Sequence, residues 1–193
     1  MKSTLKNMVL VLFCITLVCS AAVGFVYEAT KGPIDAAKAA KITQAIALVV
    51  PEFTNDPGTD RQVIDVDGGQ VVVYTAKNGD QVAGYAVETF TNNGFGGQIK
   101  LMAGFLPDGT IYKVETLQHA ETPGLGNKIE RSKSDFSVQF EGKNPATFRL
   151  AVKKDGGDVD AITASTISSR AYVDALIRAY NTVQSITNPQ NHE

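Results

Sequence analysis

The chain has 193 residues, of which 44% are hydrophobic and 20% are charged, and its formal net charge is −2. That length is enough for one domain with an anchor, and the composition is typical of folded proteins and argues against an intrinsically disordered chain. Because no basic patch alternates with aromatic residues, the sequence gives no support to nucleic-acid binding.

The N-terminal segment is the most apolar part of the chain. No charged residue occurs from 8 to 26, while Lys2 and Lys6 precede this stretch. A run of about 20 apolar residues crosses a bilayer as a helix, and positive charges favour the cytoplasmic side. We therefore expect a cytoplasmic N-terminus at 1–7, a transmembrane helix at 8–28 and a globular part outside a bacterial cytoplasmic membrane.

A cleaved signal peptide is the competing interpretation of this segment. The small residues Ser-Ala-Ala at 20–22 would suit a signal peptidase. We favour an uncleaved anchor, since the apolar span is longer than the apolar core of a typical signal peptide.

Neither the cysteines nor the histidines predict a metal site. Cys14 and Cys19 both lie in the apolar span, so the exported part has no thiol for a disulfide or a metal. His119 and His192 are isolated from each other in the sequence, and we expect no metal ligand among them. Redox chemistry in the exported part would therefore need an imported organic cofactor.

The segment 29–69 is expected to form a membrane-proximal helix and loop. Apolar residues recur at helical spacing over 34–50, and Pro51 ends this helix. Gly32-Pro33 is expected to separate it from the membrane helix. A loop containing Asn-Asp-Pro-Gly follows at 53–61.

Alternating apolar residues and turn residues predict two hairpins after this loop. The Asn78-Gly79 pair joins the first two strands, and Pro107-Asp108-Gly109 joins the second two. The expected strands cover 71–76, 81–90, 99–106 and 110–118. Such hairpins form an antiparallel sheet that can bury one face and leave the other in water.

The C-terminal third is expected to complete an α+β domain at 70–187, an antiparallel sheet with flanking helices. Its expected elements are a short helix or irregular segment at 128–139, a strand at 148–152, a turn at 155–158 and a helix at 168–184. The last helix has one apolar face, which is typical of core packing. A tail at 188–193 ends the chain.

A cluster of hydroxyl residues precedes the last helix. The sequence Asp-Ala-Ile-Thr-Ala-Ser-Thr at 160–166 leads directly into the apolar helical pattern. The N-terminus of a helix offers free N–H groups and a positive dipole end, which suit a phosphate. Helix capping alone is the simpler interpretation of these hydroxyls.

Two glycine-rich loops lie upstream of the hydroxyl cluster. One is Gly-Phe-Gly-Gly at 94–97, and the other is Glu-Thr-Pro-Gly-Leu-Gly at 121–126. Proline fixes φ and glycine admits positive φ, so both loops are tight and expose backbone. A flat aromatic ring can approach exposed backbone closely.

These motifs, in this order, resemble the FMN-binding subunits of the Rnf complex and of the sodium-pumping NADH:quinone reductase. The resemblance covers about residues 70 to 185. In that family the pattern Asp-x-x-Ser/Thr-Gly-Ala-Thr/Ser carries FMN through a phosphoester on its last hydroxyl. The matching positions here are Asp160, Thr163, Ala164, Ser165 and Thr166. Ala164 stands where the family has glycine, and Ser165 stands where it has alanine.

The resemblance implies a covalent FMN on Thr166, attached by a separate flavin transferase. Asp160 and Thr163 would belong to the recognition motif. It further implies that the flavin contacts come from Gly96, Gly97, Glu121, Thr122, Pro123, Gly124, Leu125 and Gly126. No catalytic residue of its own is expected in this chain.

The implied function is an electron-relay subunit of a membrane complex that couples electron transfer between ferredoxin and NAD to ion translocation. Such a subunit is not catalytic alone and has the other subunits as partners. We favour an Rnf-like complex because the chain is compact. The alternatives are a C-type subunit of the quinone reductase, a membrane-anchored module without redox function, and a stand-alone flavoprotein reductase domain.

Overall fold

The computed structural model describes residues 5–187. The chain consists of two compact units, the first ending at Lys41 and the second beginning at Ile42. The second unit contains the whole sheet and every site described below.

One continuous helix, α1, runs from Leu5 to Val49 and contains Pro33 in its interior. The expected interruption at Gly32-Pro33 is therefore wrong. Proline removes only one hydrogen bond from the helical ladder, and the turns on both sides continue it. The helix is long and apolar enough to cross a membrane, and its most apolar window is entirely exposed. Its end before Pro51 agrees with the expectation.

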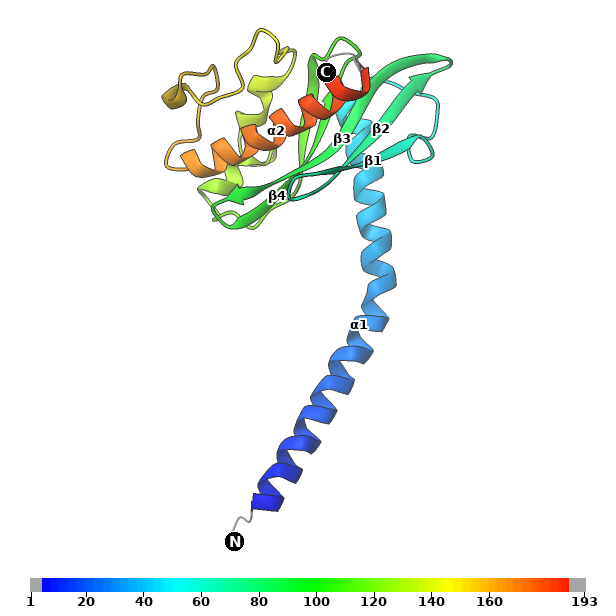
Figure 1. The fold of residues 1–193 in the computed structure, drawn as a ribbon, viewed down its shortest axis with the longest axis vertical. Coiled ribbons are helices and arrows are strands. Elements are labelled where there is room, and N and C mark those ends of the chain that lie inside the picture. The colour runs from blue at the N-terminus through cyan, green and yellow to red at the C-terminus, as the bar shows by residue number, and fades with distance from the viewer. Residues whose placement is uncertain (1–4, 188–193) are drawn as a thin grey trace. The chain divides into compact units, whose positions relative to one another are not determined.

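The second unit is built on a five-stranded antiparallel sheet with the order β1-β2-β3-β4-β5 (Figure 1). The strands are β1 (Arg61–Val66), β2 (Gly69–Asn78), β3 (Gln81–Gly94), β4 (Gly97–Phe105) and β5 (Ile111–Gln118). The last four correspond to the two predicted hairpins. β1 was not predicted, because it is a mostly exposed edge strand inside the segment expected to be helix and loop.

Both faces of the sheet are covered, which corrects the expectation of one solvated face. Helix α2 (Thr166–Thr187) lies across one face in Figure 1, where it contacts β3 and β4. The last turns of α1 pack on the other face through Ala45, Ile46 and Val49. Neighbouring strand residues therefore enter different cores: Leu101 faces the α2 side, and Met102 faces the α1 side.

The connection between β5 and α2 contains short 3₁₀ helices instead of a sixth strand. η1 (Gly126–Ile129) and η2 (Asp135–Phe140) occupy most of the segment expected to be a short helix, and η3 (Lys153–Asp155) ends where the expected turn at 155–158 begins. The strand expected at 148–152 is wrong. There the Arg149 N–H donates to the Asp158 carboxylate at 2.7 Å, so this backbone pairs with its own turn rather than with the sheet.

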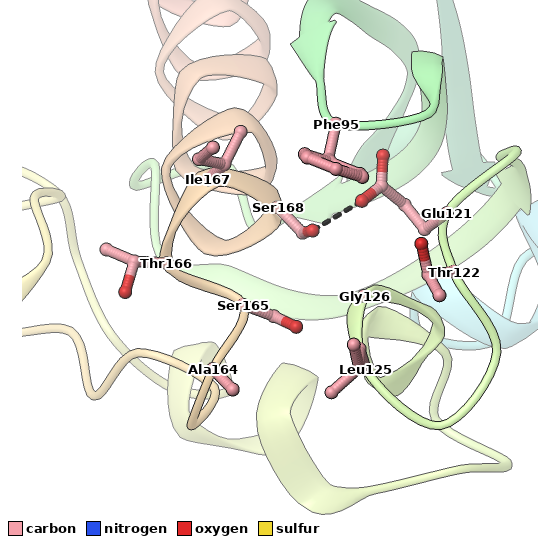
Figure 2. Close-up of a pocket in the computed structure, with 10 residues that line it drawn as sticks. All are labelled: Phe95, Glu121, Thr122, Leu125, Gly126, Ala164, Ser165, Thr166, Ile167 and Ser168. Atoms are coloured by element: carbon pink, nitrogen blue, oxygen red, sulfur yellow. Dashed lines mark hydrogen bonds between the residues drawn. The ribbon is translucent and has the colours of Figure 1, made fainter.

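Helix α2 begins two residues earlier and ends three residues later than predicted. Its buried Tyr172 ring stacks on Phe140 and meets Phe136 edge-on, which fixes η2 to the helix. The first turn of α2 lies beside the loop that carries Glu121 (Figure 2), where the Ser168 hydroxyl donates to the Glu121 carboxylate.

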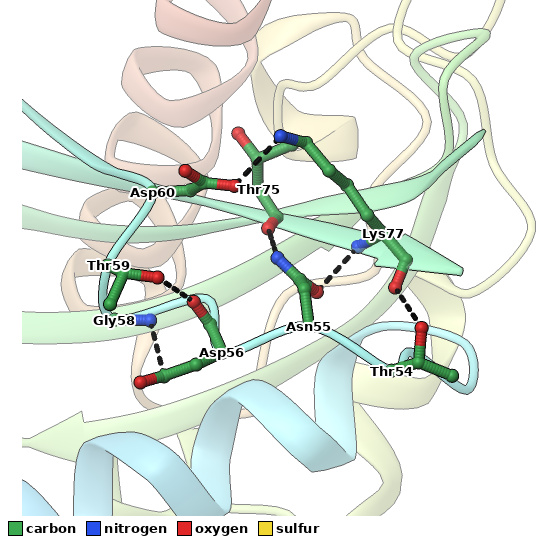
Figure 3. Close-up of polar contacts among 8 residues, drawn as sticks. All are labelled: Thr54, Asn55, Asp56, Gly58, Thr59, Asp60, Thr75 and Lys77. Carbon is green, nitrogen blue, oxygen red and sulfur yellow. Dashed lines mark hydrogen bonds and ion pairs between the residues drawn. The ribbon is translucent and has the colours of Figure 1, made fainter. Parts of the chain in front are cut away.

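The loop between α1 and β1 covers part of the edge of β2 that β1 leaves unpaired (Figure 3). The Asn55 side-chain amide donates to the Thr75 carbonyl at 2.9 Å and accepts from the Lys77 N–H at 2.8 Å. The Lys77 ammonium also pairs with Asp60 at 2.8 Å. The asparagine thus takes the place of a neighbouring strand at these two backbone groups.

Asn55→Ala is expected to destabilise the domain by about 1–3 kcal/mol, because two partly buried backbone groups lose their partner. The full chain in detergent should show this as a lower midpoint of thermal unfolding. Asp60→Asn is the control, since it weakens an exposed ion pair with Lys77 but leaves the Asn55 amide bonded to both backbone groups, so it should lower the midpoint much less. An equal loss in both variants would contradict the role of Asn55.

Candidate functional site

A pocket of about 350 Å³ opens at the N-terminus of α2 (Figure 2). Three segments form it: the turn between β3 and β4, the loop after β5, and the start of α2. Its lining residues are Phe95, Glu121, Thr122, Leu125, Gly126, Ala164, Ser165, Thr166, Ile167 and Ser168. The fold therefore brings both glycine-rich loops to the hydroxyl cluster.

The first turn of α2 presents free hydrogen-bond donors. The first N–H that bonds within the helix is that of Ser169, which donates to the Ser165 carbonyl at 3.0 Å. Over the described residues, the N–H groups of 166, 167 and 168 have no protein acceptor. These groups and the positive end of the helix dipole make a suitable environment for a phosphate.

The hydroxyl groups at this helix start differ in their accessibility. Ser168 is 2% exposed and donates to the Glu121 carboxylate, and Ser165 is 7% exposed. Thr166 is partly exposed, and Figure 2 shows its side chain pointing away from Glu121. Thr166 is thus the most accessible of these three hydroxyls to a modifying enzyme.

Ala164 adopts a left-handed backbone conformation with φ of 62°. Among the residues of 5–187, it is the one non-glycine residue with positive φ. This is the position where the family motif has glycine, and alanine in this conformation costs about 1–2 kcal/mol. The surrounding turn absorbs that cost, with the Ser165 N–H donating to the Ile162 carbonyl at 3.0 Å.

Ala164→Gly is expected to stabilise the protein by up to about 1 kcal/mol, because it removes the strain of positive φ. The measurement is the midpoint of thermal unfolding of the full chain in detergent. Ala161→Gly is the matched control: φ is not positive there, so glycine should destabilise by about 0.5–1 kcal/mol. If both variants lose stability, Ala164 is not strained.

Glu121 connects the walls of the pocket. Its side chain is buried, at 5% exposure, and accepts from the Gly96 N–H at 2.9 Å and from the Ser168 hydroxyl. Gly126 must be small here, because an added Cβ would lie 2.7 Å from the Ser168 Oγ. Two segments far apart in the sequence are therefore joined by one carboxylate.

A histidine supports this loop from outside the pocket. The Glu121 N–H donates to His119 Nδ1 at 3.0 Å, so His119 carries its proton on Nε2. That nitrogen donates to Glu130 at 2.6 Å, and this hydrogen bond is the main cause that lowers the pKa of Glu130. The contact is favourable above the ordinary pKa of a glutamate and is lost as the pH falls through the lowered value.

Six of the predicted site residues do not line the pocket. Asp160 and Thr163 are exposed, and Asp160 pairs with Lys153 at 2.6 Å. The other four shape the loops: Gly96 donates to Glu121, Gly97 and Gly124 have positive φ, and Pro123 begins the turn. Their assigned flavin contacts stay predictions.

Three further residues line the pocket: Phe95, Ile167 and Ser168. Phe95 belongs to the glycine-rich loop at 94–97, and Ser168 belongs to the group of hydroxyls at the start of the helix, so both lie in segments that the sequence indicated. The exposed fractions of Phe95 and Ile167 are 70% and 49%, and both side chains line the same pocket, which is typical of a binding site. The signal for Phe95 was its position between glycines, which leaves it at the tip of a turn. Nothing in the sequence marked Ile167.

Comparison with known proteins shows a family match over the segment that contains the pocket residues. Residues 94–181 match the model of the FMN-binding domain family. The chain is 37% identical over 187 residues to the G subunit of the ion-translocating oxidoreductase complex of Shewanella amazonensis, covering 92% of this chain and 86% of that protein. It is 38% identical to the corresponding G subunit of Cereibacter sphaeroides, covering 88% of this chain and 80% of that protein. The G subunit of Haemophilus influenzae is 36% identical, with 86% and 83% covered. By these matches and by its fold, the chain belongs to the family of G subunits of ion-translocating oxidoreductase complexes.

Proposed function

We propose that this chain is an electron-relay subunit of a membrane redox complex and carries FMN joined covalently to Thr166. The observation that carries the proposal is the accessible Thr166 hydroxyl at a helix start with three free N–H groups, beside a pocket. When bound, FMN supplies one- and two-electron redox chemistry, while the protein holds and orients it.

The donor groups and the apolar groups of the pocket fit the two parts of FMN. The N–H groups of the first turn of α2 suit the phosphate. The apolar side chains of Phe95, Leu125 and Ile167 suit the flat ring, and each is at least 43% exposed. Such side chains, exposed at a pocket rim, are typical of a binding site.

A covalent link would keep the flavin at a weak pocket. A tethered group faces its site at an effective concentration near millimolar, even when its own affinity is low. The link would join the phosphorus of FMN to the Thr166 hydroxyl oxygen in place of its hydrogen. A separate flavin transferase would take the FMN unit from FAD, breaking the pyrophosphate bond and releasing AMP together with the hydroxyl proton. The partly exposed position of Thr166 supports access by such an enzyme.

The protein is membrane-anchored, as the apolar helix α1 and its membership of the G-subunit family indicate. The positive charges of Lys2 and Lys6 support a cytoplasmic N-terminus and a domain outside the membrane. The complex would couple electron transfer between ferredoxin and NAD to ion translocation, and this subunit would not catalyse that reaction alone. The G-subunit relatives favour this assignment over a C-type subunit of the quinone reductase.

The test is to express the full chain in a bacterial membrane with and without a flavin transferase. With the transferase, the denatured chain should fluoresce on a gel and gain the mass of one FMN less one water. Without it, neither signal should appear. A colourless, unmodified chain in the presence of an active transferase would support a module without redox function.

A further inference from the structure

Glu121 is the buried carboxylate at the wall of the pocket. It accepts one hydrogen bond from each of two walls: from Gly96 in the β3–β4 turn and from Ser168 in α2. In Figure 2 its carboxylate faces the space between Phe95 and Ser168. Neither donor carries a formal charge, so both hydrogen bonds leave the negative charge in place.

No cation neutralises this carboxylate within the described part of the chain. Each ion pair found there involves other residues. His119, the nearest titratable neighbour in the loop, accepts the Glu121 N–H with an unprotonated Nδ1. The charge is balanced only by neutral donors and by the positive end of the α2 dipole.

We propose that Glu121 is a positioning residue whose charge lowers the reduction potential of the flavin. This inference rests on the proposed function, since it places the flavin in this pocket. Two-electron reduction with uptake of one proton leaves the ring one unit more negative, so a fixed negative charge at the wall opposes it. Buried charges act strongly on such equilibria because the site has a low effective dielectric constant.

Glu121→Gln separates the charge from the structural contacts. A glutamine oxygen can still accept from the Gly96 N–H, and its amide can donate to the Ser168 hydroxyl. The substitution therefore keeps both walls joined and removes only the charge. Glu121→Ala removes the contacts as well, and amide hydrogen exchange at 94–97 should become faster in that variant alone.

The experiment is a spectroelectrochemical titration of the full chain after flavinylation, in detergent. Dithionite supplies the electrons, and the buffer supplies the proton. We expect Glu121→Gln to raise the equilibrium constant for two-electron reduction at least tenfold, which corresponds to about 30 mV. Glu141→Gln is the control, because this glutamate lies outside the pocket lining and pairs with Arg131 instead of with the loop of Glu121.

Three results would overturn the inference. An unchanged potential in Glu121→Gln would show that the charge does not act on the flavin. An equal shift in Glu141→Gln would show that the effect is general. A wild-type chain without flavin, despite an active transferase, would remove the proposed function and this inference together.

Discussion

Thr166→Ala should abolish covalent flavin on the chain. The variant has no oxygen at the position where the accessible hydroxyl meets the free N–H groups of α2. After co-expression with a flavin transferase, the denatured variant should show no fluorescence, and its mass should be that of the unmodified chain. The fold should be unaffected, because the Thr166 side chain takes no part in the first hydrogen bond of the helix. That bond joins the Ser169 N–H to the backbone carbonyl of Ser165.

Two neighbouring hydroxyls supply the controls for this result. Ser165→Ala and Ser168→Ala should both retain the flavin, because these side chains are only 7% and 2% exposed. Thr166→Ser should also retain it, since the hydroxyl remains. Fluorescence that persists in Thr166→Ala would move the attachment to another hydroxyl. The unfolding midpoint of each variant distinguishes a lost acceptor from a lost fold.

The hairpins were predictable because their turns are specified locally. Asn78-Gly79 places Gly79 at φ of 60°, and Pro107-Asp108-Gly109 places Gly109 at φ of 84°. Both conformations favour glycine, so the turn residues and the alternating strands indicate the same structure. Helix α2 was also predictable from its own sequence, because its buried apolar residues recur at helical spacing along one face.

The features that were missed depend on contacts between distant segments. β1 is held by its pairing with β2 and buries little apolar surface, so its own sequence carries a weak signal. The apolar pattern at 148–152 suggested a strand, but its backbone groups bond to the turn at Asp158. Helix α1 passes through Pro33, where local rules predict a break.

The sequence motifs predicted which segments form the site, but not the contacts between those segments. The order of the motifs identified the loops and the hydroxyl cluster, and the fold joins them at one pocket. The hydrogen bond between Glu121 and Ser168 joins residues 47 positions apart, and no local pattern predicts it. The positive φ of Ala164 was foreseeable only as a consequence of the family glycine at that position.

A glycine in β4 allows α1 to dock on the sheet. Gly104 lies directly beneath Val49, the last residue of α1, and a Cβ at Gly104 would overlap the Val49 carbonyl group. That obstacle is backbone, so it cannot rotate away as a side chain would. Gly84 on β3 lies against the residues that follow α1, where an added Cβ would be 3.4 Å from Pro51 and 3.6 Å from Val50. The sheet therefore accepts the helix end only where side chains are absent.

Gly104→Ala is expected to destabilise the domain by about 3 kcal/mol or more, because the end of α1 must move off its core of Ala45, Ile46 and Met102. For a chain of this size, that loss lowers the unfolding midpoint by about 6–12 °C. Gly79→Ala is the control: its φ is 60° but the space around it is open, so it should cost only about 1–2 kcal/mol. Thermal unfolding of both full-length variants in detergent gives the comparison. Equal losses would contradict the requirement for glycine at Gly104, because φ is positive at Gly79 and not at Gly104.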